Sequence, residues 1–219
     1  MSPIERIEDN KKLLYFGVFQ VWLFHVSGII GMSLGYADWF LPKTILNLSV
    51  ALLFLILCYP IFTSKSIKVA AFVFMAGMTV EWIGVHNDWL FGSYYYGENL
   101  GPKIYGVPCI IGANWLTLTF ITSAMVKQKL GSKWLEIAAA SGLMIFIDFF
   151  IEVSAPPFDF WIWTDGEAPL RNFVAWFTIA FVLNYAVRRA DIKWNSIFSW
   201  NVYLAQLVFF MYFYFFPLF

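Results

Sequence analysis

Two carboxylates inside an apolar run are the residues of this sequence best suited to chemistry. Asp148 and Glu152 lie in a stretch that otherwise has the composition of a membrane-spanning helix. Residues four apart share one helix face, with about 6 Å of rise between them. Ionisable side chains are costly at such depth, which makes them functional candidates. A third acid, Glu81, interrupts another apolar run.

Counting helical rise places Glu81 and Asp148 at a similar depth. Each follows a lysine, Lys68 or Lys133, by a similar number of residues. At 1.5 Å per residue, each acid lies roughly 20 Å from the basic end of its helix. If the two helices pack together, all three carboxylates converge on one cavity. The alternatives are a polar bond between helices for Glu81 and Asp148, and a solvated interfacial carboxylate for Glu152.

Carboxyls gathered in a low dielectric cannot all stay ionised, because desolvation and mutual repulsion both favour the neutral form. One of the three could therefore donate a proton, while another acts as a base or holds a water molecule. This is a general acid and base arrangement. The sequence does not distribute these roles among the three acids.

Polar residues begin the apolar runs that follow each acid. Asn114, Arg171 and Asn172 could orient water or an acid, and Arg171 could bond a carboxylate. Helix capping, or snorkelling for Arg171, would also explain them. His25 lies near the middle of the first apolar run, where it either faces the cavity or packs as an ordinary buried histidine.

Aromatic residues make up 21% of the chain. Most are expected in packing and in the belts at the membrane surface. Those that flank the acids could stack on an extended apolar substrate and stabilise a carbocation face-on. They are Trp82, Trp89, Tyr94, Tyr95, Tyr96, Trp115, Trp161, Trp163 and Trp176.

The composition indicates an all-α, polytopic membrane protein. Of the 219 residues, 61% are apolar and only 13% are charged, about half the usual charge of a soluble domain. Runs long enough to span a bilayer, about 20 residues each, occur seven times. They cover about 13–35, 43–63, 67–86, 104–126, 134–154, 171–188 and 194–217, and we expect residues 1–219 to form one transmembrane domain.

The basic residues are distributed unevenly between the loops. Most of the 14 lysines and arginines fall on one side, leaving Lys43, Lys103 and Arg171 on the other. By the positive-inside rule, the N-terminus is cytoplasmic and the C-terminus lies outside. We therefore expect an integral protein of the cytoplasmic membrane that contacts lipid. The formal net charge of zero gives no basic surface for nucleic acid.

Metal and cofactor sites find no support in the residue types. Two histidines cannot build a di-iron cluster, and the acids lack the DDxxD spacing of magnesium-dependent prenyltransferases. Cys58 and Cys109 have no metal-like spacing. The last run contains no lysine for a retinal Schiff base. We expect neither a metal nor an organic cofactor.

The order of the motifs hints at an internal repeat. Glu81 precedes an aromatic loop and then GVPCIIGANW, while Asp148 precedes a second aromatic loop and then GEAPLRNFVAW. The spacing is unequal, so a duplicated helix pair and a chance similarity stay equally open.

Between residues 78 and 177 the chain resembles the membrane-embedded carotenoid hydratases of the bacterioruberin and myxol type, often called carotenoid biosynthesis proteins. The resemblance rests on a set of motifs: EWIGV from Glu81, FGSYYY from Phe91, Gly101-Pro102, Gly106-Val107-Pro108, Trp115, the Asp148 and Glu152 pair, Trp161-Ile162-Trp163, and Asn172-Phe173 with Trp176. The chain departs from the family pattern at Glu152, where Asp-Pro is expected, and at PLRNF.

The resemblance implies that water adds across the terminal 1,2 double bond of an acyclic carotenoid of the C40 type. A neutral carboxyl group would protonate carbon 2, and water activated by a second carboxylate would capture the tertiary cation at carbon 1. Asp148 is our first choice of proton donor, with Glu81 or Glu152 as its partner. Other enzymes of the carotenoid pathway are expected partners.

Two alternatives remain open. A carotenoid cyclase or isomerase would begin with the same protonation but would not add water. A proton-coupled lipid or isoprenoid transporter would use the acids as a relay, although no broken helix or convincing inverted repeat supports this reading.

Overall fold

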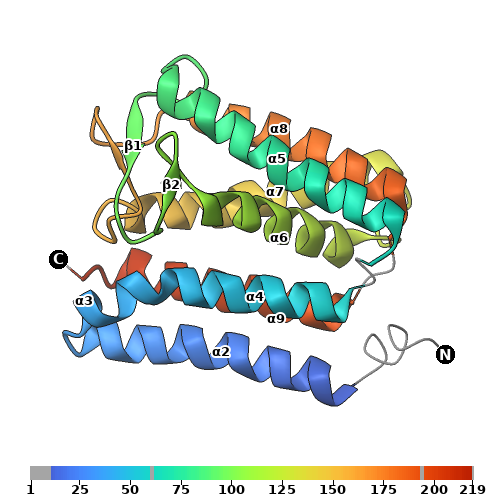
Figure 1. Ribbon diagram of the computed structural model, residues 1–219, viewed down its shortest axis with the longest axis horizontal. Helices are drawn as coiled ribbons and strands as arrows, with labels where there is room; N and C mark the ends of the chain where they lie inside the picture. The colour runs from blue at the N-terminus through green and yellow to red at the C-terminus, as the bar shows by residue number, and fades with distance from the viewer. Residues whose placement is uncertain (1–10, 60–61, 193–194, 219) are drawn as a thin grey trace.

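Seven membrane-length helical segments run side by side in one bundle (Figure 1). The computed structural model describes residues 11–59, 62–192 and 195–218. Each segment is long and apolar enough to cross a membrane, which confirms the predicted polytopic all-α fold. They are α2 (Lys11–Ser33), the continuous run of α3 (Ala37–Phe40), η1 (Leu41–Lys43) and α4 (Thr44–Cys58), then α5 (Ser64–His86), α6 (Cys109–Val126), α7 (Lys133–Ser154), α8 (Leu170–Ala190) and α9 (Ser196–Phe215).

The orientation in the membrane stays a prediction. In Figure 1, α2 begins at one end of the bundle and α9 ends at the other. Arg6 and Lys193, which contribute to the charge bias, and Trp194, where the last span was expected to begin, lie outside the described residues.

Helix α6 is the centre of the bundle. It contacts α4, α5, α7, α8 and α9, and it is the most buried of the seven spans. Nearly every residue from Ile111 to Met125 is buried, as expected for a helix enclosed by others. Helix α2 packs at the edge, against α4 and α9 (Figure 1). Side chains of α6 can therefore reach several neighbouring helices.

Two spans begin at other residues than hydropathy predicts. The second starts at Ala37 rather than near 43, because α3 and η1 continue directly into α4. It ends at Cys58, since Tyr59 adopts an extended conformation and the next residue is Pro60. The fourth begins at Cys109 rather than near 104, because the preceding apolar residues form a hairpin of β2 (Lys103–Ile104) and β3 (Val107–Pro108).

The two aromatic loops meet in a short antiparallel ribbon at one end of the bundle (Figure 1). Strand β1 (Tyr94–Tyr96) pairs with β4 (Trp161–Trp163), with Tyr94 opposite Trp163 and Tyr96 opposite Trp161. Tyr94 and Tyr96 point inward, whereas Tyr95 is exposed. The sequence predicted interfacial loops here and no strand pairing.

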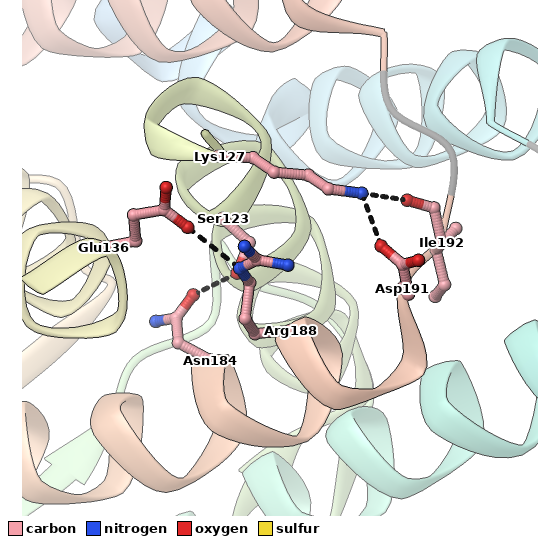
Figure 2. Close-up of polar contacts among 7 residues, drawn as sticks. All are labelled: Ser123, Lys127, Glu136, Asn184, Arg188, Asp191 and Ile192. Atoms are coloured by element: carbon pink, nitrogen blue, oxygen red, sulfur yellow. Dashed lines mark hydrogen bonds and ion pairs between the residues drawn. The ribbon is translucent and has the colours of Figure 1, made fainter. Parts of the chain in front are cut away.

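A polar cluster joins α6, α7 and α8 at the opposite end of the bundle (Figure 2). The buried Glu136 accepts a hydrogen bond from Arg188 at 2.9 Å, and Ser123 donates to Asn184 at 2.6 Å. Lys127 forms an ion pair with Asp191 at 2.8 Å. This hydrogen bond and ion pair lower the pKa of the exposed Asp191 carboxyl. The cluster fixes the far ends of the helices whose other ends carry Asp148, Glu152 and Asn172.

Candidate active site

Three acids line one cavity beneath the β1–β4 ribbon. Glu81 comes from α5, and Asp148 and Glu152 come from one face of α7. The cavity has about 490 Å³ of empty space, including its open mouth. The part of this space in which the centre of a water molecule fits measures about 30 Å³. This is enough for at least one water, which needs roughly 10–15 Å³ by that measure. The other lining residues are Phe91, Tyr94, Tyr96, Ile111, Asn114, Leu118, Ile151, Trp161, Trp163, Asn172 and Trp176.

Glu81 is held by three hydrogen-bond donors. The phenols of Tyr94 and Tyr96 donate to its Oε2 at 2.8 and 2.6 Å, and the indole of Trp115 donates to its Oε1 at 2.9 Å. Burial first, and then the Glu81 carboxyl, raise the pKa of Tyr94 and Tyr96 well above the usual range. Both phenols therefore keep their protons at physiological pH and remain donors.

Two glycines on the same face of α5 make room for these donors. A Cβ at Gly77 would come within 2.7 Å of the Cβ of Trp115. A Cβ at Gly84 would come within 2.3 Å of the Phe91 ring and 2.7 Å of the Tyr94 hydroxyl. Because such contacts are too short for any side chain, only glycine lets Trp115 and Tyr94 approach Glu81 this closely.

Glu152 has a matching set of three donors. The indoles of Trp161 and Trp163 donate to its Oε2 at 3.0 and 2.8 Å, and the Asn172 amide donates to its Oε1 at 2.8 Å. Trp161 and Trp163 alternate along β4, so both project to the same side of the ribbon. A single ribbon therefore supplies two donors to each glutamate.

Asp148 differs from both glutamates in having no donor. It is only 2% exposed, its Oδ2 is buried without a partner, and no described residue forms a hydrogen bond with the carboxyl. It lies one helical turn before Glu152, in the same cavity. The site thus combines one carboxyl without a hydrogen-bond donor and two carboxyls that each accept three hydrogen bonds.

Aromatic rings form much of the cavity wall. Trp176 stacks on Trp115 with ring centres 3.9 Å apart and an angle of 19° between the planes. Tyr94 packs against Trp163 with ring centres 5.1 Å apart. Wall rings that face a cavity can stabilise a cation through their π-systems.

Several residues selected from the sequence lie elsewhere. Trp82 is 45% exposed and its ring packs at a tilt against His86, and Arg171 is exposed without an ion pair to any described residue. Neither lines the cavity, because the helix periodicity turns them to the outside of α5 and α8. Trp89 is also exposed. His25 lines a neighbouring cavity rather than that of the acids.

The remaining candidates gather around the acids, some in roles that the sequence did not indicate. Tyr94, Tyr96, Trp161 and Trp163 were selected as rings for stacking, whereas their polar atoms bond the glutamates. The alternating patterns Tyr-x-Tyr and Trp-x-Trp are the signal that could have revealed paired strands. Apolar lining residues such as Leu118 and Ile151 had no distinguishing signal.

The suspected repeat has a counterpart in the structure. Trp115 and Trp176 occupy the same position relative to the first residues of α6 and α8, and they stack on each other. Glu81 and Asp148 lie close to the ends of α5 and α7, and the strands that follow these helices pair. The two helix pairs therefore contribute to the site in similar ways.

Fold and site together define a seven-helix membrane protein with three acids around one ring-lined cavity. The chain belongs to the carotenoid biosynthesis protein family, whose model matches residues 42–218. A curated relative is the bisanhydrobacterioruberin hydratase of Haloarcula japonica, 21% identical over 105 residues. The match covers 44% of this chain and 36% of that protein. No solved structure matches the chain. Family and relative support a role in modifying carotenoids.

Proposed function

We propose that this protein is a cofactor-independent hydratase that adds water across the terminal 1,2 double bond of an acyclic carotenoid. The observation that carries the proposal is the contrast between Asp148, which has no hydrogen-bond donor, and Glu81 and Glu152, which have three donors each. Donors stabilise a negative carboxylate. A buried carboxyl without donors, next to two such groups, is suited to hold a proton.

Asp148 gives its proton to carbon 2 of the substrate, forming a C–H bond and a tertiary carbocation at carbon 1. Water adds to carbon 1 and forms the C–O bond, and the excess proton passes to Glu152 or Glu81. Transfer of that proton back to Asp148 restores the starting state. The reaction consumes one water and neither oxidises nor reduces the substrate.

The mechanism also requires a water molecule beside the acids and groups that stabilise the cation, and the cavity provides both. It has room for a water molecule beside the acids. Its walls carry Trp161, Trp163 and Trp176, whose rings can stabilise a transient cation. Asn114 also lines the cavity, where its amide can orient the water.

Expression of the chain in cells that make lycopene, followed by mass analysis of the pigments, tests the proposal. A hydratase yields a pigment heavier by one water per modified end. An isomeric pigment without a mass gain would instead indicate a cyclase or isomerase. Unmodified pigment, together with proton-coupled uptake into vesicles, would indicate a transporter. Either of the last two results overturns the proposal.

We further infer that the protein lies in the cytoplasmic membrane with its N-terminus inside, where it contacts lipids and other enzymes of the pathway. The charge bias of the loops supports this orientation. Reporter fusions at the two ends test it, since opposite compartments are expected for the ends of a chain with seven spans. Both reporters on one side would contradict it.

A further inference from the structure

A polar pocket opens at the end of the bundle opposite the three acids, between the start of α7 and the end of α8. It lies beside the cluster of Figure 2 and has about 1100 Å³ of empty space, including its open mouth. None of its lining residues lines the cavity of the acids, so the proposed hydration gives this pocket no role. The lining residues are Gln128, Lys133, Trp134, Ile137, Tyr185, Arg188, Arg189 and Asp191.

The two acids beside the pocket already have basic partners. Glu136 accepts a hydrogen bond from the Nε of Arg188 at 2.9 Å, and Asp191 pairs with Lys127 at 2.8 Å (Figure 2). The bond to Glu136 uses one of the five N–H donors of the Arg188 guanidinium. The other donors have no hydrogen-bond partner among the described residues. Arg188 can therefore bind a further anion in the pocket while it holds Glu136.

Two more basic side chains line the pocket without an acidic partner. Lys133, at the start of α7, and Arg189, in the last turn of α8, are exposed and form no ion pair with any described residue. Because each acid beside the pocket is matched by one base, these two positive charges are in excess. A phosphate group suits such a set, since guanidinium groups bind it through paired hydrogen bonds and an ammonium group adds a point charge.

A row of aromatic rings leads from the pocket toward the middle of α8. Trp134 and Tyr185 line the pocket with nearly parallel rings whose centres are 5.7 Å apart. Trp134 also lies parallel to Phe181 at 6.2 Å, and Phe177 follows at 6.3 Å from Phe181. Tyr185, Phe181 and Phe177 are four residues apart and share one helix face. Trp134, Tyr185 and Phe177 are 61%, 42% and 38% exposed, so the row forms an apolar surface that an acyl chain can cover.

We propose that this pocket binds the headgroup phosphate of an anionic phospholipid, with Lys133, Arg188 and Arg189 around the phosphate and an acyl chain along the row of rings. Basic residues at the ends of spans also follow from membrane topology and from the helix dipole. Neither of these requires a pocket between the basic residues, or a row of rings that begins in that pocket. Basic pockets between spanning helices are suited to lipid headgroups, and a lipid bound here would link the start of α7 to the end of α8.

Native mass spectrometry of the purified protein in detergent tests this assignment. The protein is titrated with phosphatidylglycerol, which has a net negative charge, and with phosphatidylcholine, which has the same acyl chains and no net charge. Each basic residue near a membrane surface is worth about fivefold in affinity for an anionic lipid, so two unpaired cations should favour phosphatidylglycerol about thirtyfold. Both affinities come from the same preparation, and their ratio therefore does not depend on the fraction of folded protein.

Variants of the two unpaired cations, with a matched control, place the preference at this pocket. Lys133→Gln and Arg189→Gln should each lower the ratio about fivefold, and the double variant should bind the two lipids almost equally. Lys129→Gln is the control, because Lys129 is an exposed lysine of the loop before α7 that does not line the pocket. Its removal should leave the ratio unchanged.

Several results would contradict the lipid site. Equal affinities of the wild type for the two lipids would overturn it, and so would a preference that persists in the double variant or that falls equally in Lys129→Gln. Glycerol phosphate, which has the phosphate but no acyl chain, is the third ligand. If it binds as tightly as phosphatidylglycerol, the occupant is a soluble phosphate compound and the lipid assignment is wrong. None of these measurements involves the hydration of a carotenoid, so a negative result leaves the proposed function untouched.

Discussion

Replacing Asp148 by asparagine separates the chemistry of the site from its structure. Asparagine has the same shape as aspartate but has no acidic proton. Because no described residue bonds the Asp148 carboxyl, the exchange breaks no hydrogen bond, and we expect the stability to change by less than about 1 kcal/mol. A positioned general acid contributes roughly 10²–10⁴-fold to a rate. Hydration should therefore fall at least about a hundredfold.

The assay measures the initial rate of product formation by chromatography with mass detection, together with the melting temperature of the purified variant. Glu136→Gln is the matched control, since Glu136 is a buried acid of the same helix but lies in the polar cluster of Figure 2. Breaking its buried pair with Arg188 should cost about 3–5 kcal/mol of stability, with the rate per folded molecule unchanged. An Asp148→Asn variant that keeps more than about a tenth of the rate would refute Asp148 as the proton donor.

Three further predictions concern the surroundings of the acids. Tyr96→Phe removes the shortest hydrogen bond to Glu81 and should cost about 1.5–3 kcal/mol, seen as a slower initial rate and a lower melting temperature; unchanged values would show that the donor is dispensable. Burial raises the pKa of Tyr96, so its phenol should ionise only well above the usual value of about 10. In spectroscopic titrations of the wild type and of Tyr96→Phe, the variant should lack one phenol that ionises at high pH and should keep every phenol that ionises near the usual value. Trp82→Leu should change the initial rate by less than about twofold, the range of most surface substitutions, because Trp82 is exposed and away from the cavity; a larger loss would place it in contact with substrate.

The sequence predicted the helices and the common depth of the acids because both follow from regular geometry. Hydropathy identifies a span, and helical rise alone brings Glu81 level with Asp148. Sequence proximity to an acid does not tell which face of a helix a side chain occupies, so the sequence could not show that Trp82 and Arg171 lie outside the cavity lining.

Hydropathy and helical rise could not predict the pairing of the two aromatic loops. Strands β1 and β4 are far apart in the chain, and neither local periodicity nor hydropathy specifies which distant segment a strand pairs with. The donors to Glu81 and Glu152 depend on that pairing. The glycines at 77 and 84 likewise have a meaning only once Trp115 and Tyr94 are seen against α5.

The ribbon makes the two glutamates depend on one another. Side chains alternate between the two faces of a strand, so a shift by one residue turns every ring to the opposite face. A slip of β1 would replace the Tyr94 and Tyr96 phenols with the outward-facing Tyr95, and a slip of β4 would remove both indoles. A chain with either error would keep all its spans and lose donors to a glutamate, so insertion into the membrane and assembly of the site are separate events.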